Sequence, residues 1–377
     1  MQILWLDPFH GGSHAAVAAG YAARSAHQVH VLSLPTTGGW RWRMRGGAVT
    51  LARLVREQAL RPDLIVASDM LDLATLRGLT ADLLVGVPAV LYMHENQLTY
   101  PLPPGRQRDL GLAWINYTAA LVADALIFNS AFHQRDFLAA LPGLLGRYHD
   151  FQELHTIETL AAKSIVLAPG IDLAALDQVT PEPAPPGPPI ILWNARWDYD
   201  KQPELFFAAL ERLAAQGCAF RLIVAGEHID PKAPTFVAAR ARWADHIVHW
   251  GFAPDRASYT RLLHQADIVA SAALQEFFGI SLVEALYAGC WPVVPNRLNY
   301  PDLIPVAHHP ACLYAGDATS LATALGKALT QAPQQPRSQW RAIATPYDWS
   351  VMAPRYDAVL ADVARAATRP RGSRSPD

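Results

Sequence analysis

Short apolar runs that alternate with segments of helical period constrain the fold of this chain more than any other feature. This alternation is the pattern of βαβ units, in which parallel strands are buried between two layers of helices. In the first half, the expected strands are residues 3–6, 29–34, 64–67, 89–93, 125–128 and 165–167, and the expected helices include residues 15–24, 50–59 and 107–122. The pattern predicts an α/β fold built on a doubly wound sheet.

A proline-dense segment, residues 181–189, interrupts the alternation once and is expected to act as a linker, because proline cannot continue a helix or an inner strand. After it, the pattern restarts with expected strands at 190–194, 221–225, 247–250, 268–271 and 292–295 and expected helices at 203–215, 256–265 and 280–288. We therefore predict two Rossmann-like domains, residues 1–180 and 190–348, that face an interdomain cleft. Residues 349–367 are expected to form a helix that packs back on the N-terminal domain, followed by a disordered tail at 368–377.

Composition excludes several classes of protein. Of the 377 residues, 51% are hydrophobic and 17% charged, which fits a globular chain with two or three cores and not a disordered one. The net charge of -2 means that a nucleic-acid partner would have to be held by a local patch. Three widely spaced cysteines, Cys218, Cys290 and Cys312, predict a reducing compartment and no structural zinc.

The first residues lead directly into an apolar strand and carry none of the features of a signal peptide. The longest apolar stretch, residues 83–93, is about half the roughly 20 residues that a membrane-spanning helix requires. We therefore expect a cytoplasmic protein with no membrane partner.

The strongest candidate site surrounds Gly279, after the expected strand at 268–271. A helix that starts near Gly279 would present the amides of Phe278, Gly279 and Ile280 to a diphosphate. Glu276 precedes this helix and Glu284 lies more than one turn inside it, so the two carboxylates could hold hydroxyls at opposite ends of a sugar nucleotide, Glu276 on the sugar and Glu284 on the ribose. The alternative is that Glu284 only caps the helix or forms an ion pair.

A second candidate lies in the loop after the expected strand at 190–194. Arg196 and Lys201 would offer a planar fork and a point charge to a pyrophosphate and neutralise the charge that grows as a nucleoside diphosphate departs. The alternative is that they form salt bridges with Asp198 or Asp200.

Gly11 and Gly12, in the turn after the first strand, lack the full dinucleotide-binding fingerprint but would let backbone amides approach a phosphate or sugar. A metal site built from His10 and His14 is disfavoured, because the glycines between them make fixed helical geometry unfavourable. We predict no metal site.

Polar residues also follow three other expected strands. His94 follows the strand at 89–93 and is interpreted as a hydrogen-bonding partner for a sugar hydroxyl or the acceptor. Asp69, Asn129 and Ser130 are weaker candidates of the same kind.

Residues 38–47 place two tryptophans and three arginines between glycine pairs. In a strand, Arg41, Arg43 and Arg45 would share one side and Trp40 and Trp42 the other, which suits phosphate contacts and base stacking on single-stranded RNA. The alternative is a surface hairpin with its tryptophans in the core.

The residues Arg196, Lys201, Glu276 and Glu284 resemble the donor site of retaining GT-B glycosyltransferases of family four, over the whole second domain. The similarity goes further, to the tRNA-queuosine α-mannosyltransferase family. It rests on Leu4–His14, Trp42–Gly46, His94–Pro101, Phe128–Ser130, Trp193–Lys201 and Glu276–Ile280.

This resemblance implies a GT-B enzyme that transfers mannose from GDP-mannose, with retention, to queuosine in the anticodon of tRNA(Asp). It implies that the donor is bound by Gly11, Gly12, Arg196, Lys201, Glu276, Phe278, Gly279, Ile280 and Glu284. The catalytic residues it implies are His94, Arg196, Lys201 and Glu276, with His94 touching the transferred sugar. The RNA-binding segment contains Trp40, Arg41, Trp42, Arg43 and Arg45. No metal or other cofactor and no covalent nucleophile is implied.

Two other functions remain open from the sequence. The first is a GT-B glycosyltransferase that uses another nucleotide sugar and a lipid or small-molecule acceptor. The second is a non-catalytic tRNA-binding protein on a GT-B scaffold, against which the intact set of Glu276, Glu284, Arg196 and Lys201 argues.

Overall fold

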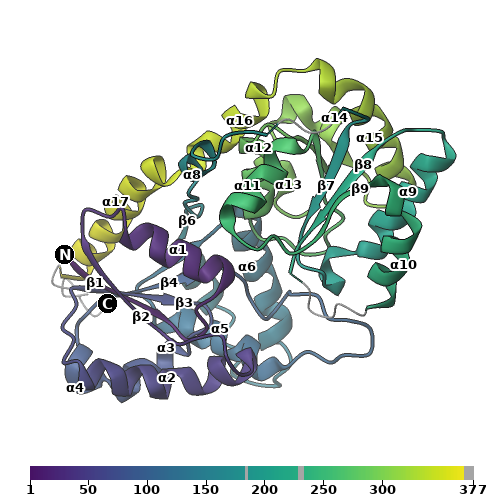
Figure 1. The fold of residues 1–377 in the computed structure, drawn as a ribbon. Coiled ribbons are helices and arrows are strands. Elements are labelled where there is room, and N and C mark those ends of the chain that lie inside the picture. The colour runs from purple at the N-terminus through teal and green to yellow at the C-terminus, as the bar shows by residue number, and fades with distance from the viewer. Residues whose placement is uncertain (183–185, 228–232, 369–377) are drawn as a thin grey trace. The chain divides into compact units, whose positions relative to one another are not determined.

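The computed structural model describes residues 1–182, 186–227 and 233–368. The described chain forms two compact units (Figure 1). Unit 1 comprises Met1–Tyr100, Gln107–Ile171 and the C-terminal segment from Trp349, whereas unit 2 comprises Pro101–Arg106 and Asp172–Asp348. The tail beyond residue 368 and residues 183–185 of the expected linker lie outside the described residues.

Unit 1 is built on a parallel sheet with the strand order β2-β1-β3-β4-β5-β6. Its strands are β1 (Gln2–Asp7), β2 (Gln28–Ser33), β3 (Leu64–Ser68), β4 (Ala89–Met93), β5 (Ala125–Phe128) and β6 (Ser164–Val166). Its helices are α1 (Gly12–Ala22), α2 (Trp40–Glu57), α3 (Leu73–Leu79), α4 (Ala81–Leu84), α5 (Leu110–Val122), α6 (Ala131–Leu145), α7 (Thr156–Ala162) and α17 (Trp349–Thr368). Every strand lies within one residue of the bounds expected from its apolar run.

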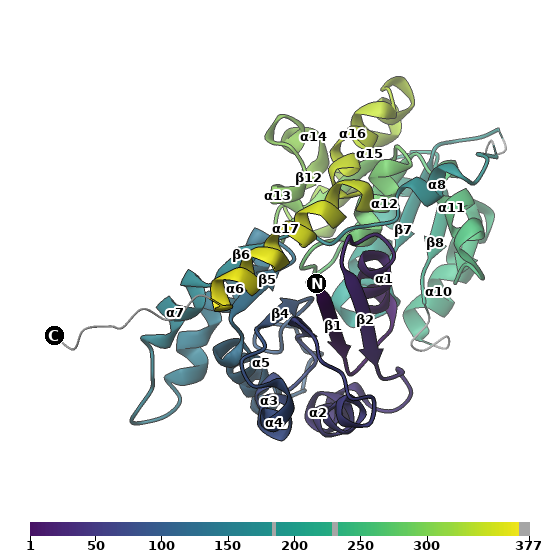
Figure 2. The same cartoon turned by 90° about the vertical axis from the view of Figure 1, so that its left-hand side faces the viewer.

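Helices cover both faces of this sheet because the strand side chains alternate (Figure 2). Leu4 and Leu6 of β1 pack with residues of α2, α5 and α6 on one face. Ile3 and Trp5 face the other way and pack with α1 and α17. The doubly wound arrangement follows from this alternation. Because helices cover both faces of the sheet, the loops that carry polar residues lie at the carboxyl ends of the strands.

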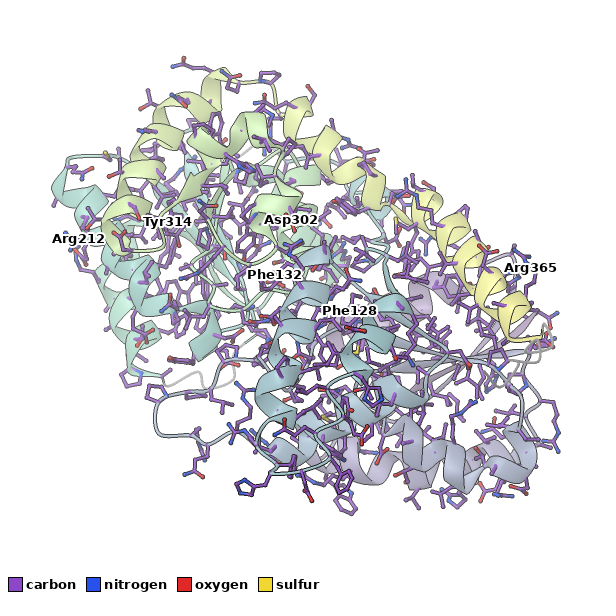
Figure 3. The ribbon with its side chains drawn as sticks, turned by 180° about the vertical axis from the view of Figure 1, so that it is seen from behind. Phe128, Phe132, Arg212, Asp302, Tyr314 and Arg365 are labelled. Atoms are coloured by element: carbon purple, nitrogen blue, oxygen red, sulfur yellow. The ribbon has the colours of Figure 1, made fainter. Side chains whose placement is uncertain are left out.

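Helix α17 belongs to unit 1 and is held there by Trp349. A Cβ added to Gly20 would lie 2.1 Å from the Trp349 indole, and one added to Gly170 would lie 2.2 Å from it, so only glycine leaves room for this ring. The Tyr356 hydroxyl donates to the Tyr92 hydroxyl at 2.9 Å. Figure 3 shows the helix from behind.

Unit 2 has a second parallel sheet, with the order β12-β11-β10-β7-β8-β9. Its strands are β7 (Ile190–Asn194), β8 (Arg221–Ala225), β9 (Ile247–Gly251), β10 (Ile268–Ala270), β11 (Trp291–Pro295) and β12 (Leu313–Tyr314). Its helices are α8 (Ala174–Asp177), α9 (Pro203–Ala215), α10 (Pro234–Arg242), α11 (Arg256–Gln265), α12 (Ile280–Tyr287), α13 (Tyr300–Leu303), α14 (His309–Cys312), α15 (Ala318–Gln331) and α16 (Ser338–Ala344). Short 3₁₀ turns, such as Tyr199–Lys201, connect some of them.

The boundary between the units differs from the sequence prediction. Unit 2 begins at Asp172, before the expected end of the first domain at residue 180, because α8 packs within unit 2. The Asp348 carboxylate accepts the backbone N–H groups of Leu173 and Ala174, both at 3.1 Å, and this contact ties the segment to the end of the unit. A proline-rich composition marks a stiff segment and does not mark where the contacts of a unit begin.

Trp40–Arg45 do not adopt the strand conformation in which their side chains were considered above, because these residues form the first turns of α2. Met44, Ala48 and Leu51 are buried, and their spacing of three to four residues is the period of a helix. The glycine pair inside this helix serves close packing. A Cβ on Gly47 would lie 2.5 Å from the Cβ of Pro8, and one on Gly46 would lie 2.8 Å from the Trp42 ring.

None of the helices in the described part of the chain combines the length and the apolarity that crossing a bilayer requires.

Candidate active site

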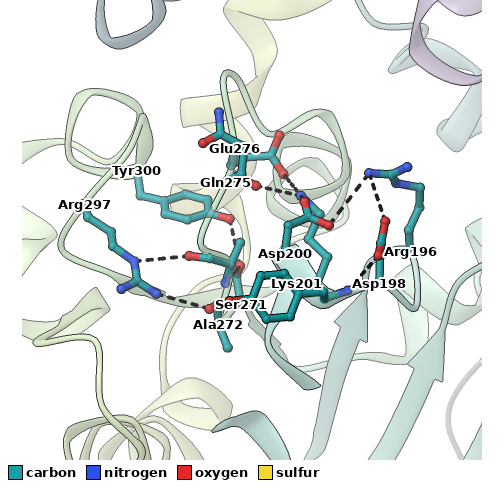
Figure 4. Close-up of polar contacts among 12 residues, drawn as sticks. Arg196, Asp198, Asp200, Lys201, Ser271, Ala272, Gln275, Glu276, Arg297 and Tyr300 are labelled. Carbon is teal, nitrogen blue, oxygen red and sulfur yellow. Dashed lines mark hydrogen bonds and ion pairs between the residues drawn. The ribbon is translucent and has the colours of Figure 1, made fainter. Parts of the chain in front are cut away.

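The side chain of Lys201 is the centre of the polar cluster in unit 2 (Figure 4). Its Nζ donates to the carbonyl of Gln275 at 2.7 Å and lies 3.2 Å from Asp200 Oδ2 and 3.4 Å from Glu276 Oε2. Burial alone would lower the pKa of Lys201, but the charges of Glu276 and Asp200 outweigh it and raise that pKa. Lys201 is therefore a cation held beside two carboxylates.

The local sequence places Lys201 at the carboxyl end of β7. Asp198 starts a 3₁₀ turn, and its Oδ1 accepts the N–H of Tyr199 at 2.7 Å. Gln202 then adopts a left-handed conformation with φ of 47°, and Pro203 opens α9, where its missing N–H costs nothing. The carbonyl of Asp200 accepts the N–H of Leu274 at 2.7 Å, which joins this loop to the loop after β10.

Arg196 lies in the same loop. Its Nη2 is 3.9 Å from both Asp198 Oδ2 and Asp200 Oδ1, and 48% of its side chain is exposed. The alternative of ion pairs with these aspartates is therefore realised, although both contacts are long. Because the Arg196 guanidinium is exposed and lies 3.9 Å from the two aspartates, it can still bind an anionic ligand.

The loop that carries Glu276 ends at Gly279, which has φ of 105° and precedes the first residue of α12, Ile280. The predicted start of this helix is confirmed. Asn299 Nδ2 donates to the carbonyl of Phe278 at 2.8 Å, and the hydroxyls of Ser271 and Tyr300 lie 2.7 Å apart. These contacts hold the loop before α12. The N-cap residue of this helix is Gly279, so no side chain of that residue caps the first amides, which is the arrangement of an anion-binding helix end.

Glu284 is 7% exposed, and its Oε1 lies 2.6 Å from Arg256 Nη1. The hydroxyl of Tyr259, one turn along α11 from Arg256, accepts a hydrogen bond from Asn194 Nδ2 at 2.9 Å. Burial raises the pKa of Tyr259 well above its usual value, and the charge of Glu284 raises it further. Glu284 therefore does form the ion pair that was considered as an alternative. Its side chain is buried, however, and lies in the same cluster as the polar side chains of Tyr259 and Asn194.

In unit 1, three strand ends bring their polar residues together around His94. The backbone N–H of His94, after β4, donates to Asp69 Oδ1 at 2.9 Å, after β3. The carbonyl of His94 accepts from Asn129 Nδ2 at 2.8 Å, after β5. Ser130 caps α6, and its Oγ accepts the N–H of His133 at 3.0 Å. The sequence predicted that these residues follow buried strands, and the structure places them at the carboxyl ends of those strands.

Gly11 and Gly12 form the turn before α1. Gly12 has φ of 53°, a conformation that glycine adopts more readily than other residues, and a Cβ on Gly11 would lie 2.4 Å from Thr36 Cγ2, so a side chain there would displace Thr36. The Nδ1 atoms of His10 and His14 lie 3.3 Å and 3.7 Å from the same oxygen of Asp7, Oδ2. In the described residues, no group of three or more His, Cys, Asp or Glu side chains is arranged to hold a metal ion.

The helical conformation of residues 40–45 distributes the arginines differently from a strand. Arg41 stacks on the Trp40 ring at 4.4 Å, Arg43 donates to the carbonyl of Thr37 at 2.8 Å, and Arg45 pairs with Asp109 at 2.6 Å. Trp42 is 70% exposed. It borders a hollow of about 250 Å³ that is lined by Trp42, Arg43, Gly46, Gly47, Val49 and Thr50.

The sequence of this chain matches known families over both units. Residues 2–171 match the family described as "tRNA-queuosine alpha-mannosyltransferase N-terminal", and residues 177–345 match "Glycosyl transferases group 1". The tRNA-queuosine alpha-mannosyltransferase of Drosophila melanogaster is 32% identical over 313 residues, which cover 81% of this chain and 82% of that protein. The chain belongs to the tRNA-queuosine alpha-mannosyltransferase family.

A second relative is more distant. The GDP-mannose:cellobiosyl-diphosphopolyprenol alpha-mannosyltransferase of Komagataeibacter xylinus is 25% identical over 347 residues, covering 81% of this chain and 87% of that protein. Both relatives are mannosyltransferases by name, and the chain is a glycosyltransferase.

Solved structures support the fold. Sucrose-phosphate synthase from Thermosynechococcus elongatus aligns with a TM-score of 0.71 at 15% identity and covers 97% of this chain and 100% of that one. The catalytic domain of starch synthase IV from Arabidopsis thaliana, bound to ADP and acarbose, aligns with a TM-score of 0.72 at 13% identity and covers 97% and 99%. The predicted two-domain GT-B fold is confirmed.

Sequence reasoning missed several residues of the two clusters in this glycosyltransferase. Arg256 and Tyr259 lie on α11, at a helical spacing that carries no motif. Asn194 is the last residue of β7, and Asn299 and Tyr300 follow β11. Polar residues at the carboxyl ends of other strands were taken as site candidates, and the same criterion would have found these three.

Proposed function

We propose that this glycosyltransferase transfers mannose from GDP-mannose to queuosine in a tRNA, with retention of configuration. The observation that carries the proposal is the Lys201 cation, whose side chain is 13% exposed and lies 3.4 Å from Glu276, a residue of the loop that leads into the uncapped first turn of α12. The names of the two relatives support the mannosyl group, the GDP-mannose donor and the tRNA acceptor.

The donor diphosphate would be held by Lys201 and Arg196 together with the amides around Gly279. As the bond between the sugar and the diphosphate breaks, negative charge grows on the leaving oxygen, and preorganised cations and amide dipoles stabilise it. Because these groups supply the positive charge, the proposal requires no metal ion. It also requires no covalent nucleophile, since retention in this family is attributed to attack on the face that the diphosphate leaves.

The sugar and the ribose would be recognised by carboxylates. Glu276 would accept hydrogen bonds from mannose hydroxyls while its charge is balanced by Lys201. Glu284 would accept from the ribose with the oxygen that Arg256 does not hold. In unit 1, we propose that His94 contacts the transferred sugar and that Gly11 and Gly12 let the backbone approach the donor or the acceptor.

The acceptor RNA would contact the start of α2. Trp42 lies against Gly46 and is 70% exposed, so its indole is held at the surface and is open to a stacked base. Arg41 and Arg43, beside it, would contact phosphates. We expect the substrate to be the aspartate tRNA and the compartment to be the cytoplasm.

A transfer assay tests the proposal directly. Purified protein is incubated with GDP-mannose and tRNA that contains queuosine, and the nucleosides are analysed by mass spectrometry, with UDP-sugars and queuosine-free tRNA as controls. The expected result is a hexose added to queuosine and only with GDP-mannose. Hydrolysis of GDP-mannose without transfer would contradict the acceptor and favour a lipid or small-molecule acceptor; the name of the Komagataeibacter relative contains a diphosphopolyprenol acceptor. The absence of any GDP-mannose turnover would contradict the donor.

A further inference from the structure

The imidazole of His94 lies flat against a second histidine, His14. The ring centroids are 3.9 Å apart and the planes differ by 25°, so the two rings are stacked. His14 comes from the first turn of α1, whereas His94 follows β4. The contact therefore joins the glycine turn after β1 to the strand end that carries a residue proposed to meet the sugar.

Asp7, the last residue of β1, holds His14. Asp7 Oδ2 lies 3.7 Å from His14 Nδ1 and 3.3 Å from His10 Nδ1. Its Oδ1 accepts the N–H of Phe9 at 3.0 Å and the hydroxyl of Ser68 at 3.2 Å. Asp7 is fully buried, and a buried carboxylate with four such neighbours is stabilised in its charged form.

The charges of this cluster follow from these contacts. Burial would raise the pKa of Asp7, but the hydrogen bond from His10 and the charge of His14, 3.7 Å away, outweigh it and hold that pKa well below its usual range. Burial would lower the pKa of His14, but the charge of the Asp7 carboxylate, 3.7 Å from its Nδ1, raises it to about 9. Burial lowers the pKa of His94 well below its usual value, and the charge of His14 lowers it further.

The other titratable groups around His94 come from neighbouring elements. They are Asp69 after β3, Tyr92 in β4, Glu95 next in sequence and His133 in α6. Burial raises the pKa of Asp69 to about 7 and lowers that of His133 to about 3. At neutral pH the one cation stacked on His94 is thus the imidazolium of His14, which Asp7 balances.

The side chain of His94 depends on this stack for its position. The backbone is fixed by Asp69 and Asn129, but the ring nitrogen Nε2 is buried and has no hydrogen-bond partner in the described part of the chain. The ring is held by packing alone, by the face of His14 and by the edge of Tyr92 at 4.6 Å and 68°. A buried polar atom without a partner is costly, and a ligand hydroxyl that bonded to it would remove that cost.

We propose that His14 is a positioning residue for His94, held against its ring by Asp7 so that His94 meets the sugar as a fixed, uncharged hydrogen-bonding group. This inference rests on the proposed function for the identity of the ligand. The chemistry favours a neutral ring, because positive charge develops on the sugar as the diphosphate departs, and a protonated His94 beside it would oppose that charge. The Asp7–His14 pair adds no net charge.

The first test needs no substrate. The full-length protein is labelled at histidine with ¹⁵N, and the imidazole signals of His94, assigned with His94→Gln, are followed by NMR from pH 5 to pH 10. His94 is expected to stay neutral over this range, and His14 to lose its proton near pH 9. In His14→Phe, which keeps a ring in the stack but removes the charge, the titration of His94 is expected to move to higher pH. A His94 that is protonated at pH 7 in the unaltered protein would overturn the proposal.

The second test separates the stack from the charge by activity. His14→Gln removes the ring, and we expect kcat to fall about 100-fold, because a misplaced group loses most of its contribution. His14→Phe should retain most of kcat at pH 8, while the acid limb of its pH profile moves upward with the titration of His94. His30→Phe, at an exposed histidine of β2, is the matched control.

The outcomes are distinguishable. Wild-type kcat and pH profile in both His14 variants would show that His14 only fills space and would overturn the inference. If the unaltered protein transfers nothing to tRNA, the proposed function fails, but the NMR titration still decides whether His14 controls His94.

Discussion

Arg256 Nη1 lies 2.6 Å from Oε1 of Glu284, a carboxylate that is almost fully buried on α12. The arginine comes from the first residue of the neighbouring helix α11, and 46% of its side chain is exposed. Water therefore screens the charge of Arg256 in this pair but not the charge of the buried Glu284. This asymmetry decides what each substitution does.

Arg256→Ala is expected to destabilise the protein, because it leaves the buried Glu284 charge without its partner. Removing one side of a buried pair is costly, but Arg256 is half exposed, so we expect a loss of about 1–2 kcal/mol in the free energy of unfolding. Urea denaturation measures it. Arg53→Ala, which breaks the exposed pair with Glu57 at 2.6 Å, is the control and should change stability by less than about 1 kcal/mol. Equal losses in the two variants would contradict the buried character of the Glu284 pair.

Lys201→Ala is expected to abolish transfer, with a loss of at least about 100-fold in kcat, because it removes a cation that stabilises the leaving diphosphate. Steady-state kinetics with GDP-mannose measures this effect, and circular dichroism checks the fold. Lys327→Ala, at an exposed lysine of α15, is the matched control and should behave as the unaltered enzyme. Turnover near the unaltered rate in Lys201→Ala would remove Lys201 from the donor site.

Gly279→Ala is expected to cost about 1–3 kcal/mol of stability, because φ of 105° is strained for a residue with a side chain. An added Cβ would meet no atom closer than 3.6 Å, so the effect isolates the backbone conformation. The KM for the donor should rise, since relaxing the turn displaces the first amides of α12. Gly78→Ala, inside α3 with open space around it, should instead stabilise by about 0.5–1 kcal/mol. Thermal unfolding measures the two changes in stability, which should have opposite signs in Gly279→Ala and Gly78→Ala.

His133 should make the protein sensitive to acid. Burial lowers its pKa from 6.5 to about 3 in the folded state, so the unfolded chain binds the proton more readily. Its contribution to stability is therefore complete above pH 6.5 and is lost as the pH falls toward 3, reaching a loss of about 2 kcal/mol at pH 5. Urea midpoints of the unaltered protein and His133→Gln, measured at pH 5 and pH 7.5, check this. An unchanged difference between the two pH values in the variant would show that another group causes the acid loss.

Trp42→Ala is expected to weaken tRNA binding by about 1–3 kcal/mol, with little change in its salt dependence, because stacking does not depend on counterions. Arg41→Ala should instead lower the slope of log affinity against log salt by about 1 if it contacts one phosphate. Binding titrations at several salt concentrations separate the two effects. Tyr148→Ala, an exposed aromatic elsewhere on unit 1, is the control. Unchanged affinity in Trp42→Ala would show that this surface does not bind RNA.

Much of the fold could be read from the sequence because its signals are local. The strands β4, β5, β7 and β8 and the helices α9 and α11 have the predicted bounds. A buried parallel strand is a short apolar run between turn residues, and the information lies within the run itself. The start of α12 after Gly279 could be predicted for the same reason. The proximity of Arg196, Lys201 and Glu276 could also be predicted, because all three follow parallel strands whose carboxyl ends lie at one edge of the sheet.

The start of α2 could not be read in the same way. The four glycines and two tryptophans at 38–47 favour an irregular or extended segment by their local preferences. The helix forms there because Met44 is buried and Gly47 lies against Pro8, and these contacts come from distant parts of the chain. Packing outweighs the intrinsic cost of two glycines inside a helix, which is roughly 1 kcal/mol each.

The sequence by itself determined the two parallel sheets and the family, because apolar runs and contiguous motifs carry that information. Only the tertiary structure decided which charges meet. The Arg256–Glu284 pair, the stack of His14 on His94 and the seat of Trp349 between Gly20 and Gly170 join residues that are far apart in the chain. Such contacts depend on the distance and burial of two side chains after folding, and no local pattern of residues carries that information.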